Sequence, residues 1–456
     1  MADKLATTLK NYADRGVSRV KLGLTDLDGV IRGKYISLAK FASVMEKGGG
    51  FCDCVFGWDV DDQLYDNATF TGWHTGFPDA PYRLLSETER WLEEEGVPYF
   101  IGEFVAADDD QYHPLCPRSA LRRVLGLADQ LGIDVRMGLE YEFFVFDETS
   151  HTVHEKAFRN LTPVTPGNFG YSVLRASTQA DLFNGLMDYC VALDTPVEGL
   201  HCETGPGVWE AALEASDAVT AADRANLFKT FCKVYFARHQ RIATFMAKWS
   251  MDYPGQSGHC HFSFLDRKGG NLFYDDQADH CISRMQQQAI AGVVRYLPEL
   301  IALIAPTVNS YTRLVKGAWA PTASTWGVEN RTAALRVIGG SAGSQRLECR
   351  APGADANPYL VAAAVIGAAV VGIQNDLEPG PAVTGNAYGL QDDLPPEQQF
   401  ATNLRDAATR LAGSGAAREL FGEVFVDHFV ASRMWEAREH ERSVNDWQLS
   451  RYFEII

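Results

Sequence analysis

Apolar and polar residues alternate with different periods along the chain, and these periods predict its helices and strands. Near the start, period-two alternation predicts strands at residues 18–24 and 33–36 around the turn Asp28–Gly29, followed by a helix at residues 38–47. A polar, proline-containing connection at residues 107–117 predicts a domain boundary. The segment before it is interpreted as a small mixed domain.

Longer elements follow this boundary. Strict alternation predicts a strand at residues 135–146, and an apolar, Ala/Gly-rich run predicts a buried helix at residues 360–373. Residues 380–396 are interpreted as a loop. Further helices are predicted at residues 119–131, 178–193, 221–247 and 286–305, and in the region from residue 396 onward. The predicted fold class is α+β, with a small domain at residues 1–112 and a larger one at residues 113–456.

Composition narrows the class of protein. Of 456 residues, 46% are hydrophobic and 22% charged, the balance of a soluble globular chain, and the formal net charge is −18. A surface this acidic repels phosphate backbones and anionic lipids, so we expect neither nucleic acid nor a membrane as a partner. Nine scattered cysteines without a CxxC pair, and no apolar leader pattern after Met1, lead us to expect reduced thiols and a cytoplasmic location.

Acidic residues two positions apart mark the predicted strand 135–146. Glu140 and Glu142 share one face of it, because side chains along a strand alternate between its two faces. Two carboxylates side by side repel each other unless a cation lies near them. A solvated strand face would also account for this pair, so its interpretation depends on the other motifs.

Three further segments carry side chains of related chemistry. They are His259-Cys-His261-Phe-Ser263 after the glycine-rich loop 255–258, Arg346-Leu-Glu348-Cys-Arg350, and Glu203 to Glu210 around Gly205-Pro-Gly207. With Glu140 and Glu142, they supply five glutamates and a histidine, mostly the oxygen ligands that Mg²⁺ and Mn²⁺ prefer. Cysteine is absent from this set, which argues against structural zinc. The sequence therefore predicts two sites for hard cations.

Arginines are concentrated at loop positions in the second half of the chain. They are Arg313, Arg331, Arg336, Arg346 and Arg350. A guanidinium fork matches carboxylate and phosphate oxygens, and next to bound cations it predicts a site that moves a phosphoryl group from ATP. The sequence has no Walker P-loop and no GxGxxG motif between a strand and a helix, which excludes those classes of nucleotide-binding protein.

The same segments, in the same order, resemble the glutamine synthetase superfamily over nearly the whole chain. The matching segments are residues 138–146, 203–210, 255–263, 309–317, 330–336, 346–352 and 356–360. The resemblance implies a small N-terminal β-grasp-type domain and a large catalytic domain whose curved antiparallel sheet is flanked by helices. It also implies glutamate as a substrate, ATP as a co-substrate, and two or more Mg²⁺ or Mn²⁺ ions in each site.

The resemblance also implies a role for each matching residue. Metal ligands are implied at Glu142, Glu203 and Glu210 for the first ion, and at Glu140, His259 and Glu348 for the second. ATP contacts are implied at His261, Ser263 and Arg346, and glutamate contacts at Arg313, Arg350 and Gly255. Stabilisation of the transferring phosphate is implied at Arg331 and Arg336. Pro254 stands where the family usually has an asparagine.

Two departures from the family pattern concern the choice of nucleophile and the regulation of the enzyme by adenylylation. Ammonia-using members carry a glutamate in the loop that here reads Gly317-Ala-Trp-Ala-Pro321, so Trp319 replaces a carboxylate that binds ammonium. An indole offers a broad apolar face and a π cloud, which resembles the members that glutamylate larger amines. A packing role for Trp319 is the alternative. Asp392 stands where adenylylated bacterial members have a tyrosine, so we do not expect that control.

In this family the N-terminal domain reaches into the site of a neighbouring subunit. Trp58 and Asp59 are therefore implied as amine contacts, whereas Trp73 and His74 are interpreted as structural. The resemblance implies a homo-oligomer, either a hexamer or a dodecamer, with its sites at subunit interfaces.

The predicted function is that of an ATP-dependent ligase of amine catabolism. It would form a γ-glutamyl amide from glutamate and an organic amine through γ-glutamyl phosphate. The alternatives are a glutamine synthetase that uses ammonia, a non-catalytic structural relative, and a guanidino kinase on a similar fold. The sequence does not name the amine, and polyamines, ethanolamine, alkylamines and anilines all stay open.

Overall fold

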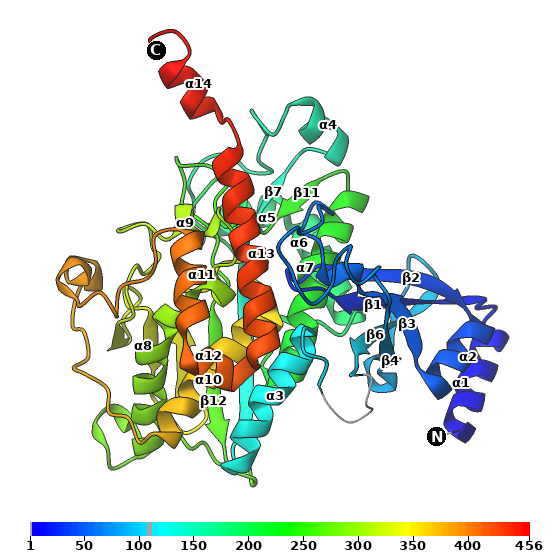
Figure 1. The fold of residues 1–456 in the computed structure, drawn as a ribbon, viewed down its shortest axis with the longest axis horizontal. Helices are drawn as coiled ribbons and strands as arrows, with labels where there is room; N and C mark the ends of the chain where they lie inside the picture. The colour runs from blue at the N-terminus through cyan, green and yellow to red at the C-terminus, as the bar shows by residue number, and fades with distance from the viewer. Residues whose placement is uncertain (1, 107–111) are drawn as a thin grey trace.

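Two β-sheets with helices packed around them make up the protein (Figure 1). The computed structural model describes residues 2–106 and 112–456. Within these residues, the first sheet has six strands in the order β2-β1-β6-β4-β3, with β5 paired to β6. Its strands are β1 (Arg19–Thr25), β2 (Ile31–Ser37), β3 (Gly49–Cys52), β4 (Asp79–Leu84), β5 (Arg90–Leu92) and β6 (Val97–Phe104).

The second sheet is larger and carries most of the predicted motifs. In the described residues it has nine strands in the order β13-β14-β15-β12-β7-β9-β8, and β10 and β11 also pair with β7. Its strands are β7 (Asp134–Phe146), β8 (Val197–Cys202), β9 (Val208–Leu213), β10 (Ser216–Asp217), β11 (Ile242–Thr244), β12 (Cys260–Leu265), β13 (Trp326–Val328), β14 (Leu335–Ile338) and β15 (Arg346–Cys349). The predicted strand 135–146 is confirmed as the central strand β7, whose pairings are antiparallel.

Most helices surround the second sheet. The described α-helices are α1 (Ala2–Asp14), α2 (Leu38–Lys47), α3 (Pro117–Gln130), α4 (Ser150–Glu155), α5 (Val173–Thr178), α6 (Ala180–Ala192), α7 (Ala218–Arg238), α8 (Arg284–Ile304), α9 (Ser310–Arg313), α10 (Pro358–Gln374), α11 (Leu404–Gly413), α12 (Gly415–Phe421), α13 (Glu423–Arg442) and α14 (Asp446–Tyr452). The short 3₁₀ helices are η1 (Asp53–Phe56), η2 (Ser86–Thr88), η3 (Asp279–Cys281), η4 (Ala387–Gly389) and η5 (Gln391–Asp393).

Helix α2 packs on the first sheet, and its start follows from local chemistry. The Ser37 hydroxyl accepts a hydrogen bond from the Lys40 N–H and so caps the helix. Phe41 is buried on the inner face, where its ring centroid lies 5.0 Å from that of Phe100 on β6. The predicted helix at residues 38–47 is confirmed; helix α1 was not predicted.

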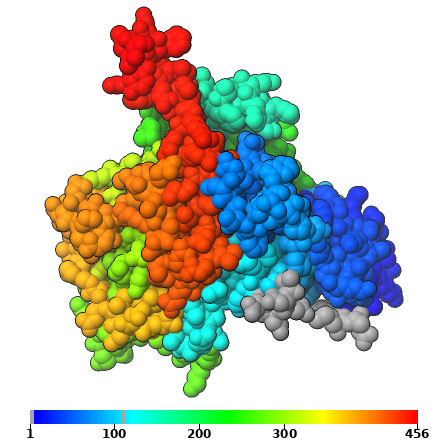
Figure 2. Space-filling model, viewed as in Figure 1, coloured from blue at the N-terminus to red at the C-terminus, as the bar shows by residue number. Residues whose placement is uncertain are grey.

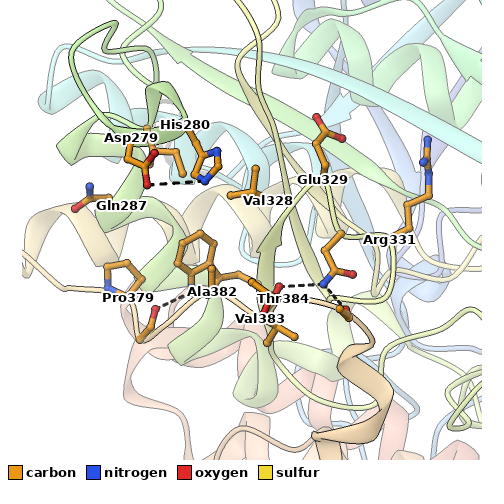
Figure 3. A pocket seen from close by; sticks show the side chains of 15 residues that line it. Asp279, His280, Gln287, Val328, Glu329, Arg331, Pro379, Ala382, Val383 and Thr384 are labelled. Carbon is orange, nitrogen blue, oxygen red and sulfur yellow. Dashed lines mark hydrogen bonds and ion pairs between the residues drawn. The ribbon is translucent and has the colours of Figure 1, made fainter.

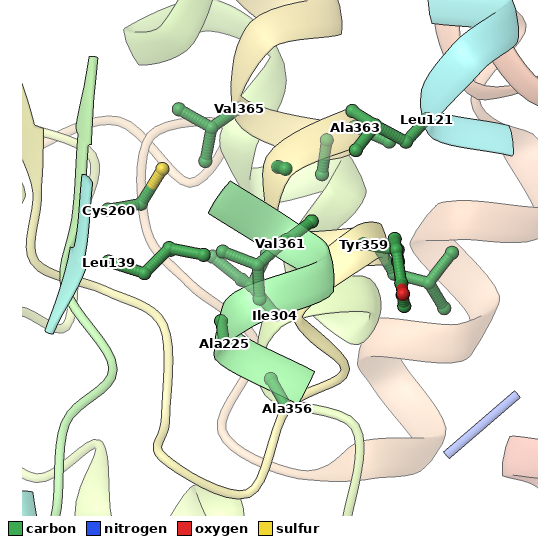
Figure 4. Packing of buried hydrophobic residues seen from close by; sticks show 14 of the residues in the cluster. Leu121, Leu139, Ala225, Cys260, Ile304, Ala356, Tyr359, Val361, Ala363 and Val365 are labelled. Atoms are coloured by element: carbon green, nitrogen blue, oxygen red, sulfur yellow. The ribbon is translucent and has the colours of Figure 1, made fainter. Parts of the chain in front are cut away.

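Helix α10 lies in the main hydrophobic core (Figure 4). Every residue from Pro358 to Gly372 is buried, and the cluster includes Leu139 of the central strand β7. Close packing against α8 depends on a missing side chain, because a Cβ atom on Gly292 would lie 2.2 Å from the Ala368 carbonyl oxygen. The predicted buried helix 360–373 is confirmed, and it supports the sheet that carries the candidate site.

One predicted helix is wrong in extent, and its neighbour in the sequence is confirmed. The prediction of a helix at 221–247 is wrong beyond Arg238, where α7 ends; Gln240 has a φ of 57°, and β11 then pairs with β7. Pairing with an open stretch of β7 overrides the apolar pattern that continues past Gln240, because strand formation depends on tertiary context. The predicted helix 178–193 is confirmed as α6 (Ala180–Ala192), and the short helix α5 before it was not predicted.

The turn between β1 and β2 is anchored on elements from the second half of the chain. The Asn357 amide, just before α10, donates hydrogen bonds to the carbonyls of Asp26 and Leu27, each at 3.1 Å. Arg433 of α13 forms an ion pair with Asp28 at 2.8 Å. Figure 2 shows the blue N-terminal residues lying beside the red helix α13. The two sheets are therefore joined through buried polar contacts.

The end of the chain projects away from the body as α14 (Figure 1) and exposes apolar side chains such as Trp447 and Phe453.

No helix within the described residues is long and apolar enough to cross a membrane. All nine cysteines are free thiols, as expected. The predicted boundary at 107–117 lies partly outside the described residues, and the division into domains at residue 112 stays a prediction.

Candidate active site

One cavity of about 610 Å³ brings together most of the residues singled out from the sequence. Its walls come from β7, β9, β12, β14 and β15 and from the loops between them. The predicted residues that line it are Glu140, Glu142, Glu203, Glu210, Gly255, His259, His261, Arg313, Trp319, Arg331, Arg336, Arg346, Glu348 and Arg350. Segments spread over more than 200 residues thus meet in one place, although the role of each residue stays a prediction.

The first acidic cluster follows from the register of three strands. Glu142 on β7 lies directly opposite Glu210 on β9, and Glu210 lies directly opposite His201 on β8. Glu203 follows β8, and its Oε1 lies 3.3 Å from His201 Nε2. The Glu142 carboxylate accepts a hydrogen bond of 2.7 Å from the Ser257 N–H, which fixes its orientation.

The second cluster forms where β12 lies between β7 and β15. His261 is directly opposite Glu348 on β15. His259 Nδ1 lies 2.5 Å from Glu140 Oε1 and 3.6 Å from Glu348 Oε1. His261 Nε2 lies 3.4 Å from Glu140 Oε2, so His261 is close enough to act as a ligand as well as the predicted His259.

The pKa values of the carboxyl groups in the two clusters are shifted in opposite directions. Burial and the negative charges of Glu140, Glu142 and Glu203 raise the pKa of Glu210 to about 10. Burial also opposes ionisation of Glu140, but hydrogen bonds from His259 and His261 outweigh it and hold its pKa well below the usual range. One cavity therefore contains Glu210, whose carboxyl stays protonated without a cation, and Glu140, whose carboxylate is stabilised by imidazoles.

Divalent cations fit this donor set. The glutamate oxygens suit hard cations, and the raised pKa of Glu210 shows that the carboxylates lack sufficient positive charge of their own. His259 Nε2 is buried and has no hydrogen-bond partner among the described residues, whereas His261 Nε2 lies 3.4 Å from Glu140 Oε2. Imidazole nitrogens left in this way beside carboxylates are available for metal binding.

Two arginines pair with Glu348, and a third lines the same cavity. Its carboxylate, 1% exposed, pairs with Arg336 at 3.0 Å and with Arg350. Arg313 is also buried, and it donates hydrogen bonds to the carbonyls of Ala351 at 2.8 Å and Arg350 at 3.1 Å. These contacts fix the guanidinium groups in place before any ligand arrives, an arrangement suited to binding carboxylate or phosphate groups.

An adjoining cavity of about 410 Å³ shares a wall with the first. His261, Ser263 and Arg346, the predicted ATP contacts, all line it. Arg346 Nε lies 3.4 Å from His261 Nδ1 and its Nη1 donates to the Ser344 carbonyl at 3.1 Å. Ser263 is the member of this trio that does not line the larger cavity.

The loop 317–321 places Trp319 at the rim of the site. Its indole lines the cavity, is 61% exposed, and sits on a backbone with a φ of 58°. Pro254 lines the same cavity. Lys316, just before the loop, forms an ion pair with Asp392.

The predicted amine contacts from the N-terminal part lie elsewhere in this chain. Trp58 is partly buried beneath the Arg32 guanidinium, 5.0 Å from the ring centroid, and Asp59 lines a different cavity. Their predicted contact belongs to a neighbouring subunit and stays a prediction. Trp73 is 79% exposed beside Phe77, and His74 Nε2 lies 2.8 Å from the Thr69 carbonyl oxygen.

A larger cavity of about 760 Å³ lies nearby but has different chemistry (Figure 3). It is lined by apolar residues such as Val328 and Pro379 together with His280 and Glu329. Arg331 borders both cavities. None of the predicted metal ligands lines it, so the smaller cavity is the better candidate active site.

Two residues of the site were missed by sequence reasoning. His201 and Tyr171 lie beside the first acidic cluster, and their rings stack with centroids 4.4 Å apart. No local motif marks His201, because its relation to Glu210 arises from pairing between β8 and β9. The alternation of His201 with Glu203 was the one available signal.

Comparison with known proteins gives a consistent family. The family profile "Glutamine synthetase, catalytic domain" matches residues 114–452. The chain is 42% identical over 445 residues to "Type-1 glutamine synthetase 2" of Dictyostelium discoideum, covering 96% of this chain and 84% of that protein. It is 34% identical over 442 residues to "Glutamate--isopropylamine ligase" of Pseudomonas sp, covering 96% of each. The solved structure "Apo GmaS without ligand" matches with a TM-score of 0.83 and 24% identity, over 98% of this chain and 99% of that one.

The fold and the profile match define a ligase, and the chain belongs to the glutamine synthetase family. The predicted glutamine synthetase-like α+β fold is confirmed. The predicted resemblance to γ-glutamyl-amine members is confirmed by the Pseudomonas relative. Members of this family use ATP and divalent metals, and they act on glutamate with ammonia or an amine.

Proposed function

We propose that the protein joins the γ-carboxyl of glutamate to an organic amine, using ATP. The observation that carries this proposal is Trp319 at the cavity rim, where ammonia-using members have a carboxylate. An ammonium ion needs an acidic partner that holds it and takes its proton. An indole offers instead an apolar wall for the substituent of a larger amine. The Pseudomonas relative, a glutamate–isopropylamine ligase by name, supports this class of substrate.

Glutamate would be held by its carboxyl groups. Arg313 and Arg350 are the proposed contacts, and the absence of a side chain at Gly255 leaves room for the substrate backbone. A Cβ atom there would lie 2.8 Å from Arg313 Cγ, so a larger residue would displace this arginine. Because the Arg313 guanidinium is already fixed by backbone carbonyls, little freedom is lost when glutamate binds.

ATP would enter from the adjoining cavity and contact His261, Ser263 and Arg346. Mg²⁺ or Mn²⁺, bound by Glu142, Glu203 and Glu210 and by Glu140, His259 and Glu348, would supply positive charge beside the phosphates. The γ-carboxylate of glutamate attacks the γ-phosphate, which gives γ-glutamyl phosphate and ADP. Arg331 and Arg336 neutralise the charge on the transferring group. The unprotonated amine then attacks the acyl carbon; the C–N bond forms as the acyl C–O bond to phosphate breaks, and the proton lost from nitrogen leaves with the phosphate.

The proposed assembly is a homo-oligomer, a hexamer or dodecamer, in the cytoplasm. Trp58 and Asp59 of one subunit would then face the amine in the site of its neighbour. This arrangement accounts for their distance from the acidic cavity of their own chain.

Glutamine synthesis from ammonia is the second candidate. The relative from Dictyostelium discoideum, 42% identical, carries the name of a glutamine synthetase. The two candidate functions differ only in the nucleophile. The ratio of kcat/KM for the amine to kcat/KM for ammonia therefore separates them.

The test is the release of ADP with glutamate and a panel of amines, compared with ammonia. Trp319→Ala is expected to lower kcat/KM for an apolar amine by about tenfold, or about 1.4 kcal/mol, because it removes an apolar contact. Trp319→Glu is expected to raise ammonia use relative to the amine. Trp447→Ala, on the projecting helix α14, is the control and should leave the ratio unchanged. If wild type prefers ammonia, or if neither Trp319 variant moves the ratio by more than about twofold, the amine proposal is wrong.

A further inference from the structure

A row of side chains crosses three strands and extends the first acidic cluster by one residue. Glu142, Glu210 and His201 lie directly opposite one another on β7, β9 and β8. Residues opposite each other on neighbouring strands point to the same face, with Cβ atoms about 4.5–5.5 Å apart. His201 thus stands at the end of the row, outside the ligand set that the family pattern implies.

The imidazole of His201 is within ligand distance of the carboxylates beside it. One ligand atom each from His201, Glu203 and Glu210 can be chosen so that all lie within 4.8 Å of one another. His201 Nε2 lies 3.3 Å from Glu203 Oε1 and 4.0 Å from Glu210 Oε2. A small group of this composition can share one divalent cation.

The orientation of this ring is set from its other side. Tyr171 stacks on it with an interplanar angle of 10°. The Tyr171 N–H donates a hydrogen bond of 2.8 Å to the Cys202 carbonyl, which ties the tyrosine to the end of β8. The stacking holds the plane of the imidazole, and the contacts of Nε2 show that this edge faces the carboxylates.

We propose that His201 is a ligand of the first cation, together with Glu203 and Glu210, and that it makes this site favour Mn²⁺ over Mg²⁺. Mg²⁺ is the harder cation, so an imidazole nitrogen in place of an oxygen penalises it more than Mn²⁺. This inference deepens the proposed function, on whose cation site it rests. The competing role is a hydrogen bond that orients Glu203 without contact to the metal.

The test counts imidazole nitrogens bound to Mn²⁺ by electron spin-echo envelope modulation, in protein without substrates. A His259→Asn/His261→Asn background removes the imidazoles of the second cluster. One nitrogen coupling is expected to remain there and to vanish when His201→Asn is added. With His259 and His261 intact and both sites filled, His201→Asn alone should lower the modulation without abolishing it. His151→Asn, on exposed helix α4, is the matched control and should change neither signal.

Metal affinity provides the second measurement, made by calorimetry on variants whose circular dichroism matches wild type. His201→Asn is expected to weaken Mn²⁺ binding by about tenfold or more, and Mg²⁺ binding by clearly less. If no nitrogen coupling remains in the background variant, if it survives His201→Asn, or if both cations weaken equally, His201 is not a ligand. Since no amine is present, failure of the amine assay would leave this result standing, and the reverse also holds.

Discussion

Cation binding to the first acidic cluster is expected to release a proton. Burial and the charges of Glu140, Glu142 and Glu203 raise the pKa of Glu210 to about 10, so near neutral pH the metal-free cluster keeps a proton. A cation can bind all of these oxygens only when that proton leaves. With one proton exchanged for one ion, the apparent affinity for the cation should increase about tenfold for each unit by which the pH is raised, up to about pH 10.

The same pKa shift determines the sign of the pH effect on stability. The unfolded chain ionises this carboxyl near 4.5, whereas the folded protein does so near 10. Between these values the folded protein binds one more proton than the unfolded chain. The free energy of unfolding of the metal-free protein should therefore fall as pH rises through this window, and added Mg²⁺ should reverse the loss.

Glu210→Gln isolates the effect, because glutamine keeps the shape of a protonated glutamate and does not titrate. Calorimetry in two buffers with different ionisation enthalpies measures the protons released on Mg²⁺ binding. We expect about one proton for wild type and none for the variant. Glu329→Gln is the control and should keep the release, because partial desolvation raises the pKa of this exposed carboxyl less than the Arg336 guanidinium lowers it. Equal proton release from wild type and Glu210→Gln would refute the reasoning.

Two further predictions concern stability. Glu348→Ala should lower the free energy of unfolding by about 3 kcal/mol, because it leaves buried Arg350 without its carboxylate partner and removes one of the two carboxylates that pair with Arg336. Glu142→Ala should abolish activity but lower the free energy of unfolding, measured by urea titration, far less than Glu348→Ala does. Equal urea midpoints for these two variants would contradict the prediction. Gly292→Ala should cost about 1–3 kcal/mol through overpacking between α8 and α10, measured by calorimetry. Gly126→Ala, where a Cβ meets nothing within 4 Å, is its control; equal losses from both would show that the helices have room to move apart.

Elements with a strong local signal could be predicted from the sequence. Helix α2 has a serine cap and an apolar face, and its predicted bounds match Leu38–Lys47. Strand β7 alternates from Asp134 to Phe143, so the shared face of Glu140 and Glu142 could be anticipated. Helix α7 shows the limit of this reasoning, because its end at Arg238 depends on the pairing of β11 with β7. No property of residues 239–247 alone marks that pairing.

The residues of the candidate site also fall into two groups, those that local motifs predict and those whose position depends on the fold. Glu140, Glu142 and His259 stand in motifs whose spacing is visible in the sequence, and the structure brings them to one cavity. His201 has no such motif, since its place is set by the register between β8 and β9. The position of Trp58 relative to an active site depends on a second chain, which no pattern within one chain can place.

The anchored turn between β1 and β2 has a consequence for how ligands enter. Asn357, Arg433 and His428 reach the N-terminal segments from the base of α10 and from α13, so a hinge between the two sheets would break several buried polar contacts at once. Each such break leaves a group without a partner and costs about 1–3 kcal/mol. Opening of the active site is then left to its loops. The loop 317–321, with its half-exposed indole, can act as a gate while the two sheets stay fixed as one rigid frame.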